Sequence, residues 1–249
     1  MSDIELEDEE ACSWFVKNQP AASPEPGRFG NLFRKRRPRL HLLVGDSVAR
    51  RASLGSRFAG DQVLNRARGG ETWSSLMQHL DTTVVSWQTV AAAEQLLPGT
   101  LIIWLTGNEA YSRLSWLSST FDGTSNFDRE LLDTVGRTAT AVIFKSRRLA
   151  EEVLVLGPLP RLAGEIAEAS WESTAAFHLE RTLLKLEVKF QFITLGRALT
   201  RKMGRNRHGL RGCETWFHTD GVHLSAAGYM KLADAAALPV WLVLGAASG

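Results

Sequence analysis

The sequence predicts a three-layer α/β/α domain with a central five-stranded parallel sheet, preceded by a disordered N-terminal tail. Two observations support this fold class. Short apolar runs alternate with longer segments of helical period from residue 40 onward, an order typical of parallel strands covered by helices on both faces. With 249 residues and 44% hydrophobic content, the chain can bury a substantial core, so one domain at 40–249 and a tail at 1–39 are expected.

Each element has its own sequence signal. Apolar runs bounded by glycine or polar residues predict five strands, at 40–44, 62–65, 100–106, 153–156 and 190–195. Helical periods and start signals predict helices that begin at 48 and 226 and helices at 72–97, 127–150 and 165–188. Helical spacing in the last of these predicts a row of core side chains: Trp171, Ala175, Leu179, Leu183 and Leu186. The apolar run at 238–244 is expected to pack against the domain or a partner.

The first 39 residues differ in composition from the rest. An acidic run and a stretch rich in Pro, Ser, Ala and Gly lead to a basic cluster, Arg34–Arg39. Charge blocks without an apolar period are typical of solvated, disordered chain. A second basic stretch, Arg197–Arg211, holds six Arg or Lys residues and no acidic one. A solvated tail and a solvated surface are the simpler interpretations of the two stretches. The alternative for Arg34–Arg39 is a nuclear-import signal or a nucleic-acid contact, and the alternative for Arg197–Arg211 is contact with an anionic substrate or with nucleic acid.

Cysteine content and apolar runs limit the class of protein. The two cysteines, Cys12 and Cys213, provide no disulfide framework. No apolar segment follows a basic start, and no apolar run approaches the ~20 residues of a membrane span. An intracellular location is therefore expected, with cytoplasm and nucleus both open.

The block Gly45-Asp46-Ser47 carries the first chemical signal. It follows the apolar run at 40–44 and precedes a helix start, which places Ser47 in a strand-to-helix turn. Free N–H groups at a helix N-terminus favour negative charge, so an oxyanion forming beside Ser47 is stabilised there. The alternative is that Ser47 is only a helix N-cap.

A serine nucleophile needs a base, and the block Asp220-Gly221-Val222-His223 supplies one. A histidine can take the serine proton when an acceptor holds its other ring nitrogen in the right tautomer. The three-residue offset allows Asp220 to be that acceptor for His223. Ser225 is expected to cap the following helix, so His223 is expected on an anchored loop.

Two further stretches can supply donors to a tetrahedral intermediate. The paired glycines of 65–72 permit unusual backbone dihedrals, so Gly70 can offer its N–H. Asn108, after the third predicted strand, can offer its side-chain amide. Together with the N–H of Ser47 these make three donors. A turn role for Asn108 and a plain surface role for His223 are the alternatives.

These blocks give the chain a resemblance to the SGNH hydrolases, the superfamily of the GDSL esterases and lipases, over roughly residues 40 to 238. The family's invariant residues are a serine in Gly-Asp-Ser, a glycine, an asparagine and a histidine in Asp-x-x-His. The resemblance implies a catalytic triad of Ser47, Asp220 and His223. It implies an oxyanion hole formed by Ser47, Gly70 and Asn108, and an SGNH/flavodoxin-like sheet.

Two of the four blocks depart from the family pattern. Glu109 follows Asn108 where the family usually has Asp, and Gly107 is displaced by one position. Ala67 stands where the second block often has a glycine. Since Asn108 is the donor and its neighbour supports the loop, we expect altered loop geometry and retained chemistry.

The expected function is hydrolysis of carboxylic esters through an acyl-enzyme on Ser47. The resemblance allows small-molecule, glycan and lipid acyl esters as substrates, and short-chain O-acyl groups are favoured. Tyr111 and Trp116 follow the Asn108 block in a polar loop and are expected to line the substrate pocket, unless they only tie the loop down. The alternative is a nucleic-acid-associated SGNH-like module, non-catalytic or bifunctional and of retrotransposon origin. Its contacts are expected at Arg34–Arg39 and Arg197–Arg211.

No cofactor or metal is expected. The six histidines include no pair at helical i, i+4 spacing with the carboxylate of a zinc hydrolase motif. A metal held by His218, Asp220 and His223 is the alternative. It leaves Ser47 and Asn108 without roles.

Overall fold

The computed structural model describes residues 36–111, 129–162, 170–205 and 207–246. From Arg37 onward these residues belong to one compact unit. The predicted tail lies almost entirely outside the described residues, as does Trp116. The disorder of the tail and the boundary at residue 40 therefore stay predictions.

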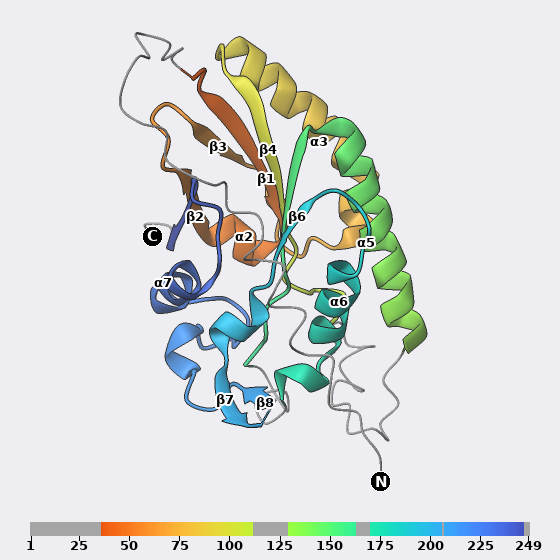
Figure 1. Ribbon diagram of the computed structural model, residues 1–249, viewed down its shortest axis with the longest axis vertical. Coiled ribbons are helices and arrows are strands. Elements are labelled where there is room, and N and C mark those ends of the chain that lie inside the picture. Colours follow the sequence, from red (N-terminus) through yellow and green to blue (C-terminus); the bar gives the residue numbers. More distant parts are fainter. Residues whose placement is uncertain (1–35, 112–128, 163–169, 206, 247–249) are drawn as a thin grey trace, which may run out of the picture. The chain divides into compact units, whose positions relative to one another are not determined.

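A five-stranded parallel sheet forms the centre of this unit, as predicted (Figure 1). Its strands lie in the order β3-β1-β4-β5-β6. Their bounds are β1 Arg39–Gly45, β3 Gln62–Asn65, β4 Leu97–Trp104, β5 Glu152–Leu156 and β6 Gln191–Ile193. All four neighbouring pairs run parallel, so the carboxyl ends of these strands lie at one edge of the sheet.

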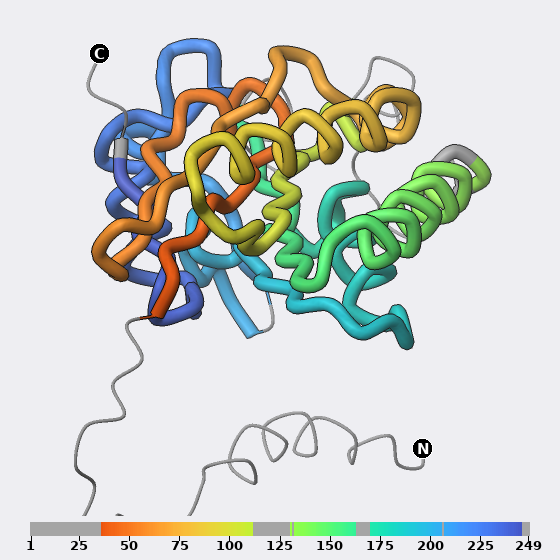
Figure 2. Tube along the Cα trace, turned by 90° about the horizontal axis from the view of Figure 1, so that it is seen from above, coloured from red at the N-terminus to blue at the C-terminus, as the bar shows by residue number. Residues whose placement is uncertain are grey.

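Alternating side chains divide the core between the two faces of the sheet. In β4, Leu101 and Ile103 join one buried cluster, and Ile102 and Trp104 join the other. The first cluster includes side chains of α3 (Trp73–Ala93), α5 (Arg129–Leu149) and α6 (Ala175–Leu184). The second includes side chains of α2 (Ser47–Arg51) and α7 (Ala226–Ala235). Helices therefore cover both faces, and Figure 2 shows α3 and α5 together on one side.

One predicted helix was wrong in its extent. The helix expected at 165–188 is a short 3-10 helix at Trp171–Ser173 followed by α6, and 163–169 lie outside the described residues. Thr174 separates the two because its backbone is extended and its side chain accepts from the Phe177 N–H as the α6 N-cap. The predicted row was right about burial, since Trp171 and three α6 side chains are buried. Leu186 is partly buried and packs against the cluster that contains Leu179 and Leu183.

Two small antiparallel sheets were not predicted. The C-terminal run becomes β9 (Leu242–Ala246), which pairs with β2 (Ala52–Ser56). A second pair, β7 (Arg201–Gly204) and β8 (Arg207–Gly209), forms from the basic stretch. The helix expected at 72–97 ends earlier, at Ala93, and β4 takes up Leu97.

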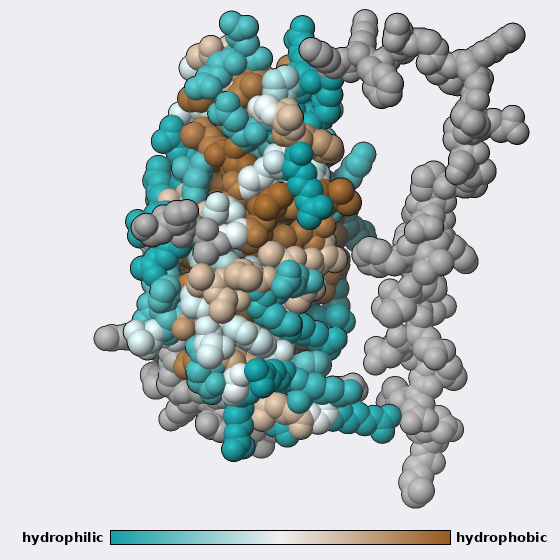
Figure 3. Space-filling model, turned by 90° about the vertical axis from the view of Figure 1, so that its left-hand side faces the viewer, coloured by the Kyte–Doolittle hydropathy of each residue, from teal (hydrophilic) through white to brown (hydrophobic). Residues whose placement is uncertain are grey.

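The face that carries β2 and β9 shows apolar side chains at its surface (Figure 3). Leu242 and Leu244 of β9 are buried, whereas Val240 and Val243 are exposed, as is Phe58 after β2. The C-terminal run thus packs against the domain and also leaves apolar surface. Within the described ranges, no helix has both the length and the apolar character needed to cross a membrane.

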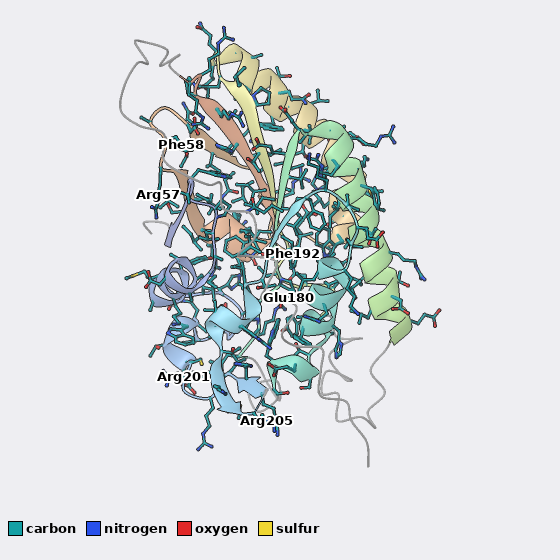
Figure 4. All side chains as sticks on the ribbon, in the orientation of Figure 1. Arg57, Phe58, Glu180, Phe192, Arg201 and Arg205 are labelled. Atoms are coloured by element: carbon teal, nitrogen blue, oxygen red, sulfur yellow. The ribbon has the colours of Figure 1, made fainter. Side chains whose placement is uncertain are left out.

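Glu180 is a buried carboxyl group on α6, and Figure 4 shows it in the interior between α6 and the neighbouring strands. Burial raises its pKa from about 4.5 to about 7, although the backbone N–H groups of Gly196 and Leu195 and the charge of Arg197 act in the opposite direction. Because the folded-state pKa is the higher one, this group favours the native state at low pH. That contribution is lost as pH rises from about 4.5 through about 7.

Glu180→Gln is therefore expected to stabilise the protein at pH 8, where the wild type must bury a charge. The shift sets an upper limit of about 3 kcal/mol on the gain in unfolding free energy, and the two proteins should converge below pH 5. Urea unfolding at both pH values measures this. The exposed Glu187→Gln serves as the control, and an equal difference at both pH values would contradict the assignment.

Candidate active site

The turn after β1 positions Ser47 through two close contacts. A Cβ on Gly45 would lie 2.1 Å from the Trp104 carbonyl oxygen and 2.7 Å from the Ala49 Cβ, so only glycine lets β1 end this close to β4 and α2. Asp46 is fully buried and is the N-cap of α2, accepting from the Val48 N–H at 2.9 Å. Ser47 is thus the first residue of α2, and the interpretation of Ser47 as the N-cap was wrong.

Asp46 also joins the ends of two strands. Its second carboxylate oxygen accepts from the Thr106 N–H at 2.8 Å and from the Thr106 hydroxyl. Burial raises the pKa of Asp46, and the hydrogen bonds from Thr106 and Val48 counteract this. Asp46 therefore fixes the turn that carries Ser47 to the loop that carries Asn108.

The structure brings Ser47, His223 and Asp220 into a hydrogen-bonded chain. His223 Nε2 lies 2.8 Å from Ser47 Oγ, and His223 Nδ1 lies 2.6 Å from Asp220 Oδ2. Asp220 Oδ1 accepts from the N–H groups of Val222 and His223, both at 2.9 Å. Ser225 caps α7 by accepting from the Gly228 N–H, which anchors this loop as predicted.

These hydrogen bonds keep Asp220 ionised. Burial alone raises its pKa, but the His223 ring and the two backbone N–H groups outweigh burial and hold the pKa well below its usual value. An ionised Asp220 accepts the Nδ1–H of His223, which leaves Nε2 free to accept the Ser47 proton.

The loop with Gly70 runs beside the end of β1. The Arg66 N–H donates to the Leu43 carbonyl and the Arg68 N–H to the Gly45 carbonyl, both at 2.8 Å. Gly70 has φ +75°, a left-handed conformation that favours glycine, as its sequence block predicts. The loop thus passes along the strand that ends at Ser47.

Asn108 is held by groups at both ends of its amide. Nδ2 donates to the Glu71 carbonyl at 2.9 Å, and Oδ1 accepts from Arg161 Nη2 at 2.6 Å. The Glu71 carboxylate is itself bonded to the Ser75 hydroxyl and to His79 Nε2, the latter at 2.9 Å. Nδ2 has two hydrogens, so one remains for a ligand.

This chain resembles known proteins in its fold and not detectably in its sequence. No protein-family model matches the chain, and no curated protein matches it by sequence. Axe2, an acetylxylan esterase from Geobacillus stearothermophilus, is 18% identical, with a TM-score of 0.51 over 79% of this chain and 91% of that one. A lipase/acylhydrolase from Enterococcus faecalis is 17% identical, with a TM-score of 0.50 over 78% and 91%. The chain has the SGNH hydrolase fold.

Glu109, the departure from the usual SGNH pattern, caps a helix. Its carboxylate accepts from the Trp73 N–H at 2.8 Å and from the Ser74 N–H and hydroxyl at 3.2 Å. These N–H groups lie in the first turn of α3, directly after the Gly70 loop. The side chain next to the Asn108 donor therefore ties the third sequence block to the second.

Glu109→Ala is expected to lower the unfolding free energy by about 1–2 kcal/mol, because two N–H groups of α3 lose a charged acceptor. Urea unfolding measures the loss, with Glu187→Ala, an exposed carboxylate outside the helices, as the control. A loss no larger than that of the control would show that the cap contributes little.

The structure describes only one of the two residues predicted to line the substrate pocket, Tyr111. Tyr111 is buried, its hydroxyl donates to the Leu159 carbonyl at 3.1 Å, and its ring lies under the Arg161 guanidinium. These contacts favour the alternative that Tyr111 ties the loop down. Trp116 lies outside the described residues.

Arg161 is the site residue that the sequence analysis missed. It lies in the Pro-Leu-Pro-Arg segment after β5, and only 9% of it is exposed. The available signal was its place beyond the carboxyl end of a central strand, where open α/β sheets carry their sites. Burial lowers the pKa of its guanidinium, while Tyr111 and the carboxylates of Asp46 and Asp220 raise it.

The alternative of a metal held by His218, Asp220 and His223 has no support in the described part of the chain. No group of three or more His, Cys, Asp or Glu residues is placed there to hold an ion. Both ring nitrogens of His223 are already within hydrogen-bond distance of Ser47 and Asp220.

Proposed function

We propose that this protein is a serine esterase that hydrolyses carboxylic esters in two steps. The observation that carries the proposal is the chain Ser47 Oγ, His223 Nε2, His223 Nδ1 and Asp220 Oδ2, with contacts of 2.8 and 2.6 Å. Ser47 attacks the ester carbonyl while His223 takes its proton, and His223 then protonates the leaving alcohol. Water hydrolyses the acyl-enzyme with the same groups.

Three donors are proposed to stabilise the oxyanion: the N–H groups of Ser47 and Gly70 and the free hydrogen of Asn108 Nδ2. Their support is the position of Ser47 at the N-terminus of α2, the left-handed turn at Gly70 and the fixed amide of Asn108. Donors held in place before the reaction stabilise charge without reorganisation, and each is typically worth about 2.7–4 kcal/mol.

Short O-acyl esters are the proposed substrate class. The fold is shared with an acetylxylan esterase, which makes an acetyl ester the first group to assay. The sequence contains no evident amphipathic lid helix of the lipase kind, which also favours short acyl groups.

The test combines turnover and covalent labelling of the full chain. We expect hydrolysis of p-nitrophenyl acetate, slower hydrolysis of longer acyl esters, and a fluorophosphonate adduct that mass spectrometry maps to the peptide containing Ser47. A folded protein with neither turnover nor adduct would overturn the proposal. An adduct on another serine would show that this other serine, and not Ser47, is the nucleophile.

A second candidate function is nucleic-acid contact, and the β7–β8 hairpin favours it. Figure 4 shows Arg201 and Arg205 on this hairpin, which extends from the body of the unit. Arg201, Lys202, Arg205 and Arg207 are all exposed there. Guanidinium and ammonium groups on a projecting ribbon suit a phosphate backbone. Of the predicted cluster Arg34–Arg39, residues 36–39 are described, and Arg36 and Arg37 are exposed there.

Retention on single-stranded RNA and DNA at rising salt tests this candidate. Nucleic-acid contact predicts a steep loss of affinity with salt, and a smaller slope when Lys202 and Arg205 are changed to Gln. Exposed Arg148 on α5, changed to Gln, is the control. No retention at low salt would leave the hairpin as a solvated surface.

A further inference from the structure

Arg161 contacts the oxyanion machinery through one atom pair. Its Nη2 donates to Asn108 Oδ1 at 2.6 Å, and its guanidinium carbon lies 4.8 Å from the centre of the Tyr111 ring. We propose that Arg161 is a positioning residue that sets the orientation of the Asn108 amide and strengthens its N–H as a donor. This inference rests on the esterase function proposed above.

The orientation argument follows from the donors and acceptors. The two ends of an asparagine amide have nearly the same shape, so only their partners decide which end faces the oxyanion. A flipped Asn108 would set its NH₂ against the Arg161 guanidinium, which has donors only. The same flip would set its oxygen against the Glu71 carbonyl. Arg161 and Glu71 therefore select the single orientation in which Nδ2 donates.

The donor argument follows from charge. A guanidinium stays protonated at every pH at which esters are assayed. A cation bonded to the amide oxygen draws electron density from the amide nitrogen, and hydrogen bonds in such a chain strengthen one another. The remaining Nδ2 hydrogen thus becomes a better donor as negative charge develops on the ester oxygen. Arg161 acts through Asn108 and need not touch the substrate.

The segment that carries Arg161 is tied to both sides of the site. The Leu159 N–H donates to the Thr106 carbonyl at 3.2 Å, on the loop before Asn108. The Leu162 N–H donates to the Gly221 carbonyl at 2.7 Å, inside the loop of the triad. With a nearly buried side chain between these anchors, the guanidinium has few other positions to occupy.

A double-mutant cycle in the full chain tests the proposal. Arg161→Gln is expected to lower kcat for p-nitrophenyl acetate about 10²–10³-fold, the loss typical of one oxyanion donor, with KM little changed. In an Asn108→Ala background the same change should cost under about threefold, because both residues act as one unit. Arg161→Lys keeps the charge and should fall between wild type and Arg161→Gln. Arg148→Lys on α5 is the matched control.

Losses that multiply in the double variant would overturn the proposal, as would an unchanged kcat in Arg161→Gln. A second measurement keeps the test independent of turnover. The side-chain amide signals of Asn108, assigned by their absence in Asn108→Ala, should move toward solvent-like shifts and average in Arg161→Lys. Unchanged amide signals would also overturn it. If the wild type has no esterase activity, the proposed function fails while the amide signals still report on the positioning.

Discussion

Ser47→Ala is expected to abolish ester turnover and fluorophosphonate labelling, with kcat reduced by roughly 10⁴-fold or more. The variant loses Ser47 Oγ, the proposed nucleophile, which lies 2.8 Å from His223 Nε2. Without it, no acyl-enzyme can form. Ester hydrolysis by water held in the oxyanion hole is the only activity that should remain. Progress curves with p-nitrophenyl acetate, recorded on matched protein, measure the loss.

The same substitution should leave stability within about 0.5 kcal/mol, which separates chemistry from folding. Ser47 is not the cap of α2, because Asp46 accepts the Val48 N–H and the Thr106 groups. Alanine is also a good residue for the first turn of a helix. Ser53→Ala, at an exposed position of β2, is the control. Residual turnover above about 10% of wild type would place the nucleophile elsewhere.

The central sheet could be predicted because its signal is local. Each strand is an apolar run that ends near glycine or a polar residue, and buried strands of a parallel sheet are apolar on both faces, as in β4 and β5. Two features of the fold could not be predicted in this way: the pairing of β2 with β9 and the break in the predicted helix at Thr174. β2 and β9 lie at opposite ends of the domain sequence, and their pairing depends on tertiary contacts. The break at Thr174 required weighing a capping threonine against a longer apolar period.

The candidate site likewise has residues that could be predicted from the sequence and residues that could not. Ser47, Gly70, Asn108 and His223 lie in short motifs whose chemistry is visible in the sequence. The roles of their supports depend on residues that are distant in the chain. The bond from Arg161 to Asn108 spans 53 positions, and that from the Trp73 N–H to Glu109 spans 36. Motifs thus locate the proposed reacting groups, and the structure adds the groups that hold them.

Asp220→Asn is the second large effect expected, a loss in kcat on the order of 10⁴-fold with little change in KM. The change is confined to one atom. An asparagine keeps Oδ1 and its two backbone hydrogen bonds from Val222 and His223, so the loop geometry persists. Its NH₂ replaces Oδ2, which lies 2.6 Å from His223 Nδ1. Nδ1 then becomes the acceptor, and the proton moves to Nε2.

With a proton on Nε2, His223 donates to Ser47 instead of accepting from it, so the serine loses its base. Because hydrogen bonds from His223 and Val222 hold the pKa of Asp220 well below its usual range, wild-type Asp220 stays ionised and the loss in Asp220→Asn should be similar from pH 6 to 9. Steady-state kinetics across that range measure this loss, with Asp234→Asn, at an exposed position of α7, as the control. A loss below about tenfold would show that the imidazole is oriented without Asp220. In that case the contact between Ser47 and His223 would be sufficient on its own for activation.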